Sequence, residues 1–211
     1  MSATTSQKGI YGLTVTDLFQ QPDDATPLES EERDGLLQTW ITHRRDLNEA
    51  EEANILEGAA WARSRRQRNR DLLTEDFIRQ LHARMFGDVW DWAGAYRTTE
   101  RNIGVAPHRI ANDTIMLLDD VRYWVDHATY PTDEIAVRFH HRLVAIHPFP
   151  NGNGRHARLI ADLLVEHLGG EPFTWGGGTL HDIGALRAAY VGALRHADNH
   201  DIEPLLAFAR S

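Results

Sequence analysis

Residues 147–158 read HPFPNGNGRHAR, and this stretch decides the fold because it joins two helical patterns through a glycine-rich turn. An apolar helical pattern over 135–146 leads into the turn, and a second one over 159–164 follows it. Backbone N–H groups point outward at the start of a helix, where the helix dipole favours negative charge. The stretch therefore predicts a helix–loop–helix unit with an anion-binding site where the second helix begins.

The residue types in this turn suit a polyphosphate. Gly152 and Gly154 let the backbone approach a phosphate closely. Arg155 and Arg158 are three residues apart, so they share a helix face and offer two planar guanidinium groups. Asn153 adds an amide donor. The alternative is an ordinary turn with solvated arginines, but so many residue types at fixed spacing argue against chance.

His147 stands at the entrance of the loop and is suited to general-base chemistry near neutral pH. A zinc site is the alternative use for the histidines of this region, which also include His140, His141 and His156. No H-E-x-x-H motif is present, and the adjacent His140 and His141 face different sides of one helix. We therefore expect a general base at His147 and a mixture of core and surface histidines elsewhere.

Composition limits the function classes. The 211 residues include no cysteine, which excludes a disulfide framework, a Cys-ligated metal and a thiol nucleophile. A net charge of -9 argues against direct nucleic-acid binding, so the basic run at 63–70 is expected to be a solvated helix end. The sequence shows no signal-peptide pattern and no apolar run of about 18 residues. We expect a cytoplasmic protein that does not contact membranes.

The rest of the chain predicts a mostly α fold. Residues 1–29 are polar and indicate an N-terminal arm before a main domain at 30–211. Strand-favouring residues between Trp92 and Ile110 predict one short β-hairpin. Periodic apolar residues predict helices over 30–47, 48–69, 74–87, 110–127, 131–146, 152–168, 182–196 and 202–210.

These motifs resemble the Fic/Doc (Fido) family, whose signature loop reads H-x-F-x-[D/E]-G-N-G-R-x-x-R. Residues 86–94 and 96–98 are similar to the family's lead into its flap hairpin. The block from 121 to 164 resembles a bacterial subgroup called mobile mystery protein B. The likeness spans about residues 30–205 and implies a Fic-type helical bundle with a short β-hairpin flap.

The resemblance implies a protein adenylyltransferase, which moves AMP from ATP to a Ser, Thr or Tyr hydroxyl of a target protein. His147 would deprotonate that hydroxyl. The nucleotide would be bound by residues of the signature loop, namely Asn151, Gly152, Asn153, Gly154, Arg155 and Arg158. The flap would pair with the target backbone through Thr98, Thr99, Ile103, Gly104 and Val105.

Asn151 departs from the family pattern, which has Asp or Glu at this position to hold Mg²⁺. An amide oxygen can ligate Mg²⁺ but brings no charge, so we expect Asn151 to be a weak magnesium ligand and the activity to be reduced. The alternative function is a catalytically weakened Fic-fold module that binds nucleotide or protein in a toxin-like mobile-element system. The subgroup implies a small DNA-binding partner protein encoded alongside.

A helix at about 48–69 resembles the family's N-terminal inhibitory helix, with the pattern [S/T]-x-x-x-E-[G/N]. Glu57 and Gly58 match that pattern, whereas Ala53 stands at the Ser/Thr position. The resemblance implies that Glu57 pairs with Arg158 and restrains the enzyme. The alternative is that Glu57 is a surface residue of an acidic helix.

Overall fold

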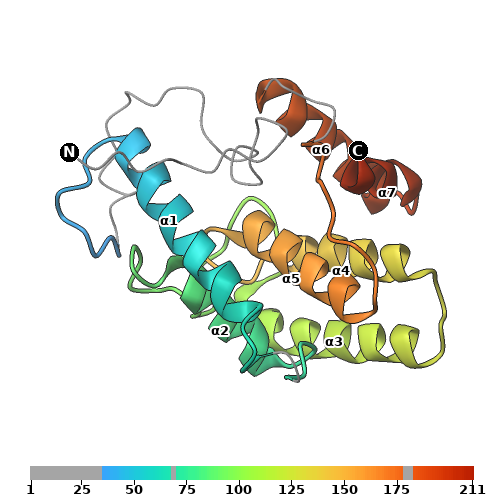
Figure 1. Ribbon diagram of the computed structural model, residues 1–211. Coiled ribbons are helices and arrows are strands. Elements are labelled where there is room, and N and C mark those ends of the chain that lie inside the picture. The colour runs from blue at the N-terminus through green and yellow to red at the C-terminus, as the bar shows by residue number, and fades with distance from the viewer. Residues whose placement is uncertain (1–34, 68–69, 178–182) are drawn as a thin grey trace. The chain divides into compact units, whose positions relative to one another are not determined.

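The computed structural model describes residues 35–67, 70–177 and 183–211 (Figure 1). These residues fall into two compact units that divide after Pro172. The first unit contains α1 (Arg44–Ala62), α2 (Glu75–Phe86), the 3₁₀ helix η3 (Pro107–Arg109), α3 (Ile110–Asp126), α4 (Thr132–Ile146) and α5 (Asn153–His167). The second contains α6 (Ile183–Asp198) and α7 (Glu203–Arg210). The predicted mostly α fold is confirmed, and the predicted arm at 1–29 lies outside the described residues.

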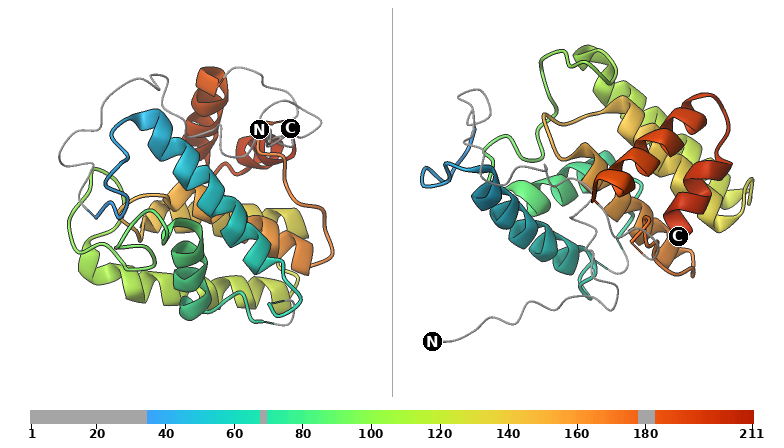
Figure 2. Two further views of the ribbon diagram at one scale, coloured as in Figure 1. Left: turned by 60° about the vertical axis from the view of Figure 1, so that its left-hand side comes forward. Right: turned by 90° about the horizontal axis from the view of Figure 1, so that it is seen from above.

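Helix α5 is the most deeply buried helix of the first unit. Every residue from His156 to Val165 is buried, including the charged Arg158 and Asp162. Helix α4 packs along α5, and α3 packs beside α4 (Figure 2). Helix α2 closes the core near the start of α5, because the Phe86 ring packs against Gly152. The glycine-rich loop is therefore held between helices rather than at a free edge.

Helix α2 begins after a capping residue and carries apolar residues at helical spacing. Thr74 is the N-cap, and its hydroxyl accepts a hydrogen bond from the Phe77 N–H at 3.2 Å. Phe77, Ile78, Leu81 and Met85 share one face at helical spacing, and all four are fully buried. Burial of each such side chain contributes about 1.5–3 kcal/mol.

Helix α1 packs against α2 through a face that is more polar than a typical core helix. Its buried residues recur at helical spacing and are Leu47, Glu51, Asn54, Gly58 and Ala62. The Asn54 side chain donates to the Arg84 carbonyl (3.1 Å) and accepts from the Asp88 N–H (2.9 Å). Backbone groups in the last turn of α2 and just after it thus fix the register of α1.

The chain before α1 is not helical, so the helix predicted over 30–47 is wrong between residues 35 and 43. Leu36 instead forms an antiparallel bridge with Trp90. The Leu37 N–H donates to the Val89 carbonyl, and the Asp91 N–H donates to the Gly35 carbonyl, both at 2.9 Å. These tertiary backbone bonds replace the local bonds of a helix. The helix predicted over 48–69 begins earlier, at Arg44, and already ends at Ala62, so residues 63–67 of the basic run form turns and a bend rather than a helix end.

The segment from 93 to 106 contains no strand, so the predicted β-hairpin is absent from this described part of the chain. The segment is an irregular loop on the α4–α5 connection. The Arg97 N–H donates to the Pro148 carbonyl (2.9 Å), and the Val105 N–H donates to the Ile146 carbonyl (3.2 Å). The backbone of this segment therefore forms hydrogen bonds with the connection between α4 and α5 instead of pairing with itself as a hairpin.

The second unit is a helical hairpin with its own small core. The N–H groups of Thr174 and Trp175 both donate to the Ala209 carbonyl at 3.0 Å, which ties the start of this unit to α7. Trp175 is fully buried, and Tyr190 of α6 contacts Phe208 of α7.

None of the helices within 35–67, 70–177 and 183–211 combines the length and the apolar character that crossing a bilayer requires. The longest, α1, has 19 residues and is rich in charged side chains.

We predict that Gly58→Ala destabilises the protein, although alanine is the better helix former. A Cβ at position 58 would lie 2.9 Å from the Arg84 carbonyl group and the Met85 Cα, which are backbone atoms that cannot move away. We expect a loss of about 1–3 kcal/mol in the free energy of unfolding, measured by urea denaturation.

Gly192→Ala in α6 is the matched control, because a Cβ there meets nothing within 4 Å. Its effect should have the opposite sign, a gain of up to about 1 kcal/mol from helix propensity. Equal effects of the two substitutions would contradict close packing of α1 on α2.

Candidate active site

Between α4 and α5 the chain reverses direction through two residues in the left-handed backbone conformation. His147 caps the end of α4 with φ 55° and ψ 60°, and Gly152 caps the start of α5 with φ 77°. A Cβ on Gly152 would lie 2.5 Å from the Phe86 ring, so this position requires glycine for space as well as for backbone angle. His147 adopts its left-handed angles without that freedom, which is a conformation that the surrounding structure must hold in place.

The Asn153 side chain closes the loop from inside. Its amide oxygen accepts from the Phe149 N–H and its amide nitrogen donates to the Phe149 carbonyl, both at 2.8 Å. Asn153 is 3% exposed and Phe149 is fully buried. The amide that sequence analysis placed on a phosphate is thus engaged within the loop, and Asn153 faces an incoming anion only through its backbone N–H.

His82 of α2 also holds this loop, and sequence analysis did not single it out. Its Nε2 donates to the Asn151 carbonyl and its Nδ1 accepts from the Gly94 N–H, both at 3.0 Å. The ring stacks on Phe149 with centroids 3.7 Å apart. The only signal in the sequence is that His82 falls on the apolar face of α2, next to Leu81.

The start of α5 presents the anion-binding groups that the sequence predicted. The first bond of the helix runs from the His156 N–H to the Gly152 carbonyl. The N–H groups of residues 153–155 precede it and have no partner within the helix. Asn151 is exposed beside them, with its Oδ1 accepting from the Gly152 N–H at 2.7 Å. Because Gly152 has no side chain and the N–H groups of residues 153–155 are not used within the helix, a phosphate can approach this end of α5.

The two signature arginines differ in their surroundings. Arg158 is fully buried in α5. Arg155 lies one turn nearer the loop, with its guanidinium 4.9 Å from the centre of the Phe86 ring. Its Nη1 donates to Oε2 of Glu51 at 2.6 Å. A carboxylate of α1 therefore already neutralises one of the two arginines that the resemblance assigned to nucleotide binding.

Glu51 is the second functional residue that sequence analysis missed. Its side chain is 5% exposed, and its other oxygen accepts from the Trp90 indole N–H at 2.7 Å. Such a buried ion pair, in which both carboxylate oxygens accept a hydrogen bond, holds both partners in one geometry. The signal in the sequence is helical spacing, because Glu51 falls on the same face of α1 as Asn54 and Gly58.

The predicted contact between Glu57 and Arg158 is not present in the described residues. Glu57 is exposed, and no ion pair joins it to Arg158. Six positions separate Glu57 from Glu51, which turns its side chain away from the buried face of α1. Gly58 does lie on that face, where its lack of a side chain permits close contact with α2.

His147 is half-buried beside the irregular loop, and its pKa is lowered. Burial is the largest cause, followed by the positive charge of Arg97, while Arg101 adds a smaller effect in the same direction and the Val144 carbonyl opposes them. A lowered pKa keeps the imidazole neutral at pH 7, which is the form that accepts a proton. The geometry therefore supplies a general base at the mouth of the loop.

The predicted flap residues lie beside His147. Thr98, Thr99, Ile103 and Gly104 are exposed, whereas Val105 is partly covered. A Cβ on Gly104 would lie 2.6 Å from the His147 Cβ, so the loop closes directly over the base. Exposed backbone next to a base is suited to receive an extended peptide, even though the loop itself is not a hairpin.

The donor set does not fit a resident Mg²⁺ ion. Asn151 Oδ1 is a neutral oxygen that already accepts a hydrogen bond. Across the described ranges, no three His, Cys, Asp or Glu side chains gather as metal ligands would. Mg²⁺ prefers charged oxygens in octahedral geometry.

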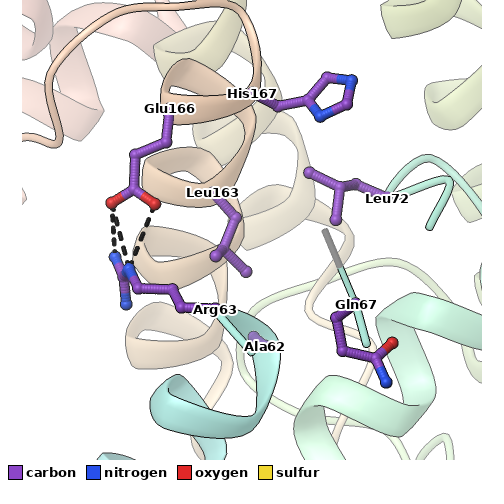
Figure 3. A pocket seen from close by; sticks show the side chains of 7 residues that line it. All are labelled: Ala62, Arg63, Gln67, Leu72, Leu163, Glu166 and His167. Carbon is purple, nitrogen blue, oxygen red and sulfur yellow. Dashed lines mark hydrogen bonds and ion pairs between the residues drawn. The ribbon is translucent and has the colours of Figure 1, made fainter. Parts of the chain in front are cut away.

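A cavity of about 280 Å³ lies at the far end of α5 from the signature loop (Figure 3). Arg63 follows the last residue of α1 and binds Glu166 through Nε (3.1 and 3.2 Å) and Nη2 (2.8 Å). Leu72 and Leu163 line its apolar side. Helix α1 is thus joined to α5 by two Arg–Glu pairs, one at the signature loop and one at this cavity.

Comparison with known proteins identifies the region of the site. Residues 72–165 match the family described as Fic/DOC family. "Protein adenylyltransferase fic-1" of Caenorhabditis briggsae is 33% identical over 140 residues, which is 63% of this chain and 26% of that protein. The chain thus spans about a quarter of this relative's length. Residues 72–165 are therefore similar to a Fic/DOC family domain.

Solved structures agree on the fold. The structure described as "Fic-1 (aa134 - 508) from C. elegans" matches with a TM-score of 0.56 and 29% identity, over 75% of this chain and 48% of that one. A Fic domain of a cell filamentation protein from Bartonella quintana with bound ADP matches with a TM-score of 0.62 over 90% of this chain and 92% of that one. At 16% identity, the second match shows the fold alone.

Three buried histidines around the site make stability depend on pH. Burial is the main cause that lowers the pKa of His82 well below 6.5, that of His156 to about 4 and that of His140 to about 3. The unfolded chain protonates these residues near pH 6.5, whereas the folded chain does not. Stability is therefore retained above pH 6.5 and falls below it, by at most about 1.4 kcal/mol per pH unit for each histidine.

Urea denaturation between pH 7.5 and 5.5 checks this dependence. The variant His156→Gln should lose one histidine's share of the slope, and the exposed His108→Gln should keep the full slope. A free energy of unfolding that stays constant over this pH range would refute the assignment of neutral buried histidines.

Proposed function

We propose that this chain transfers AMP from ATP to a Ser, Thr or Tyr hydroxyl of a target protein. The observation that carries the proposal is the juxtaposition of a neutral, half-buried His147 with the open N-terminus of α5 and its two arginines. The Fic/DOC match and the adenylyltransferase names of the relatives support the same reaction.

The α5 N-terminus would hold the phosphates. Backbone N–H groups of Asn153 and Gly154 would receive the α- and β-phosphates, since the helix dipole favours negative charge there, and the Gly152 N–H would join them by giving up its bond to Asn151. Arg155 would bind the polyphosphate. Arg158 would act on the γ-phosphate from its buried position in the same helix.

His147 would act on the target hydroxyl. Its neutral imidazole accepts the hydroxyl proton as the oxygen attacks the α-phosphorus. The new bond joins the target oxygen to AMP, and the bond between the α-phosphorus and the bridging oxygen breaks to release pyrophosphate. Positioning and charge neutralisation by the loop carry most of the catalysis. The exposed segment 98–105 would align the target backbone beside His147.

Mg²⁺ would reach the site as a complex with ATP rather than as a resident ion. Asn151 would offer it one neutral oxygen, which is a weaker ligand than the carboxylate usual in the family. This substitution supports a second candidate function, a weakly active Fic-fold module that binds nucleotide or protein.

The wider setting is also a proposal. The resemblance to mobile mystery protein B suggests a bacterial, cytoplasmic protein with a toxin-like role. A small DNA-binding protein encoded alongside would then be its partner.

We expect labelled AMP to move from α-³²P-ATP onto protein in a lysate incubated with this chain. His147→Ala should abolish the labelling and leave ATP affinity within about twofold, because the loss falls on the chemical step. Full labelling by His147→Ala would remove His147 as the base. ATP binding by the wild-type chain without any labelling would favour the binding module.

Helix α1 would restrain the enzyme through Glu51 rather than through Glu57. The Glu51 carboxylate occupies Arg155 and would repel an incoming polyphosphate, so ATP has to displace a buried ion pair. Release of α1, or neutralisation of Glu51, would free the arginine for the nucleotide.

We predict that Glu51→Gln raises AMP transfer by about tenfold or more, since about 1.4 kcal/mol of competition corresponds to a tenfold change in affinity. The glutamine oxygen can still accept from Trp90, but its NH₂ group cannot accept from Arg155. Saturating ATP should raise the Tm of this variant by more than that of the wild type.

Glu57→Gln is the matched control, because it removes the same charge from an exposed position of the same helix. It should leave transfer and the ATP-induced change in Tm as in the wild type. Activation by Glu57→Gln alone would instead restore the assignment made from the sequence.

A further inference from the structure

Arg97 is a buried cation whose partners are backbone carbonyls. It is 3% exposed. Its Nε donates to the His147 carbonyl at 2.7 Å, its Nη1 to the Thr99 carbonyl at 2.9 Å and its Nη2 to the Val105 carbonyl. None of the described carboxylates forms an ion pair with it. A guanidinium buried in this way is costly, so its position calls for a reason beyond closing a surface loop.

The Arg97 contacts converge on the backbone of His147. The side chain binds the carbonyl of His147, and the Arg97 N–H binds the carbonyl of Pro148. His147 has φ 55°, a left-handed backbone conformation that is strained for a non-glycine residue. Two bonds from one residue to successive carbonyls resist relaxation of that conformation.

The same guanidinium closes the irregular loop above the base. It joins the two sides of the loop at Thr99 and Val105, while Gly104 lies against both His147 and Arg97. A Cβ on Gly104 would lie 2.7 Å from Arg97 Nη2, so this close approach of the loop to Arg97 requires glycine. One side chain thereby fixes both the base and the segment proposed to receive the target.

We propose that Arg97 is a positioning residue for the transfer reaction, and that its guanidinium holds the His147 backbone and the loop over it in one geometry. The inference rests on the proposed function, because it gives His147 the role of base. It assigns Arg97 no contact with nucleotide or target.

The positive charge of Arg97 has a second effect, which is on the pKa of His147. Arg97 is the strongest charge that acts on His147, and with burial and Arg101 it lowers the His147 pKa, against the opposing Val144 carbonyl. A positive neighbour disfavours the imidazolium and so preserves the proton-accepting form. A residue that served loop folding alone would not need to carry charge.

Two variants separate charge from hydrogen-bonding geometry. Arg97→Gln removes the charge and should raise the His147 pKa toward its ordinary value, measured from the imidazole NMR signals. Arg97→Lys keeps the charge but not the planar fork, so it should keep the lowered pKa. Both variants should speed hydrogen exchange at the Val105 N–H and lower kcat by about tenfold or more, with a smaller change in KM. In Arg97→Gln the acid limb of the kcat profile should also move to higher pH.

Arg109→Gln is the matched control, since Arg109 is an exposed arginine near the loop that pairs with Asp113 at 3.0 Å. It should change neither the His147 pKa nor the transfer rate. An Arg97→Gln protein that folds and keeps both the wild-type kcat and the wild-type hydrogen exchange at the Val105 N–H would overturn the proposal. If Arg97→Gln does not fold, wild-type kcat and wild-type Val105 exchange in Arg97→Lys would overturn it.

The pKa and exchange measurements need no transfer reaction. A wild-type chain that labels no protein would therefore refute the proposed function, while these two measurements would still decide whether Arg97 positions His147.

Discussion

The connection between α4 and α5 places backbone polar groups inside the protein, where each must find a hydrogen-bond partner. Side chains provide many of these partners. Asn153 binds both groups of Phe149, His82 binds the Asn151 carbonyl, and Arg97 binds the His147 carbonyl. A loop satisfied in this way is rigid, so the start of α5 and the base before it are held ready for a substrate. The chemistry proposed for this site depends on that rigidity, because positioning rather than covalent catalysis carries it.

Two arginines beside the loop, Arg155 and Arg97, are already bound by other groups of the protein. Arg155 is neutralised by Glu51, which reaches it from α1. Arg97 is buried against carbonyl dipoles, and its charge acts on His147. The same helix that supplies Glu51 is attached to the other end of α5 by Arg63 and Glu166. Helix α1 is therefore part of the electrostatics of the site, although it lies outside the matched Fic/DOC region.

Prediction from the sequence succeeded where local signals were strong. Helices α2 to α7 lie within a few residues of the predicted ranges, because capping residues and apolar spacing are local properties. It failed at 35–43 and at 93–106, where backbone groups bond to distant segments. Strand-favouring residues such as Ile103 and Val105 show only that extended backbone is acceptable, and the partner of that backbone is a tertiary matter.

The sequence by itself determined the helical class, the loop at 147–158 and the identity of His147 as the candidate base, because these follow from residue types at short spacing. Only the tertiary structure decided that Glu51 rather than Glu57 meets a signature arginine, that Asn153 turns inward, and that His82 and Arg97 hold the loop. The physical reason is distance along the chain. Glu51 and Arg155 are joined by no local pattern, and packing of α1 on α2 sets which carboxylate becomes buried beside the site.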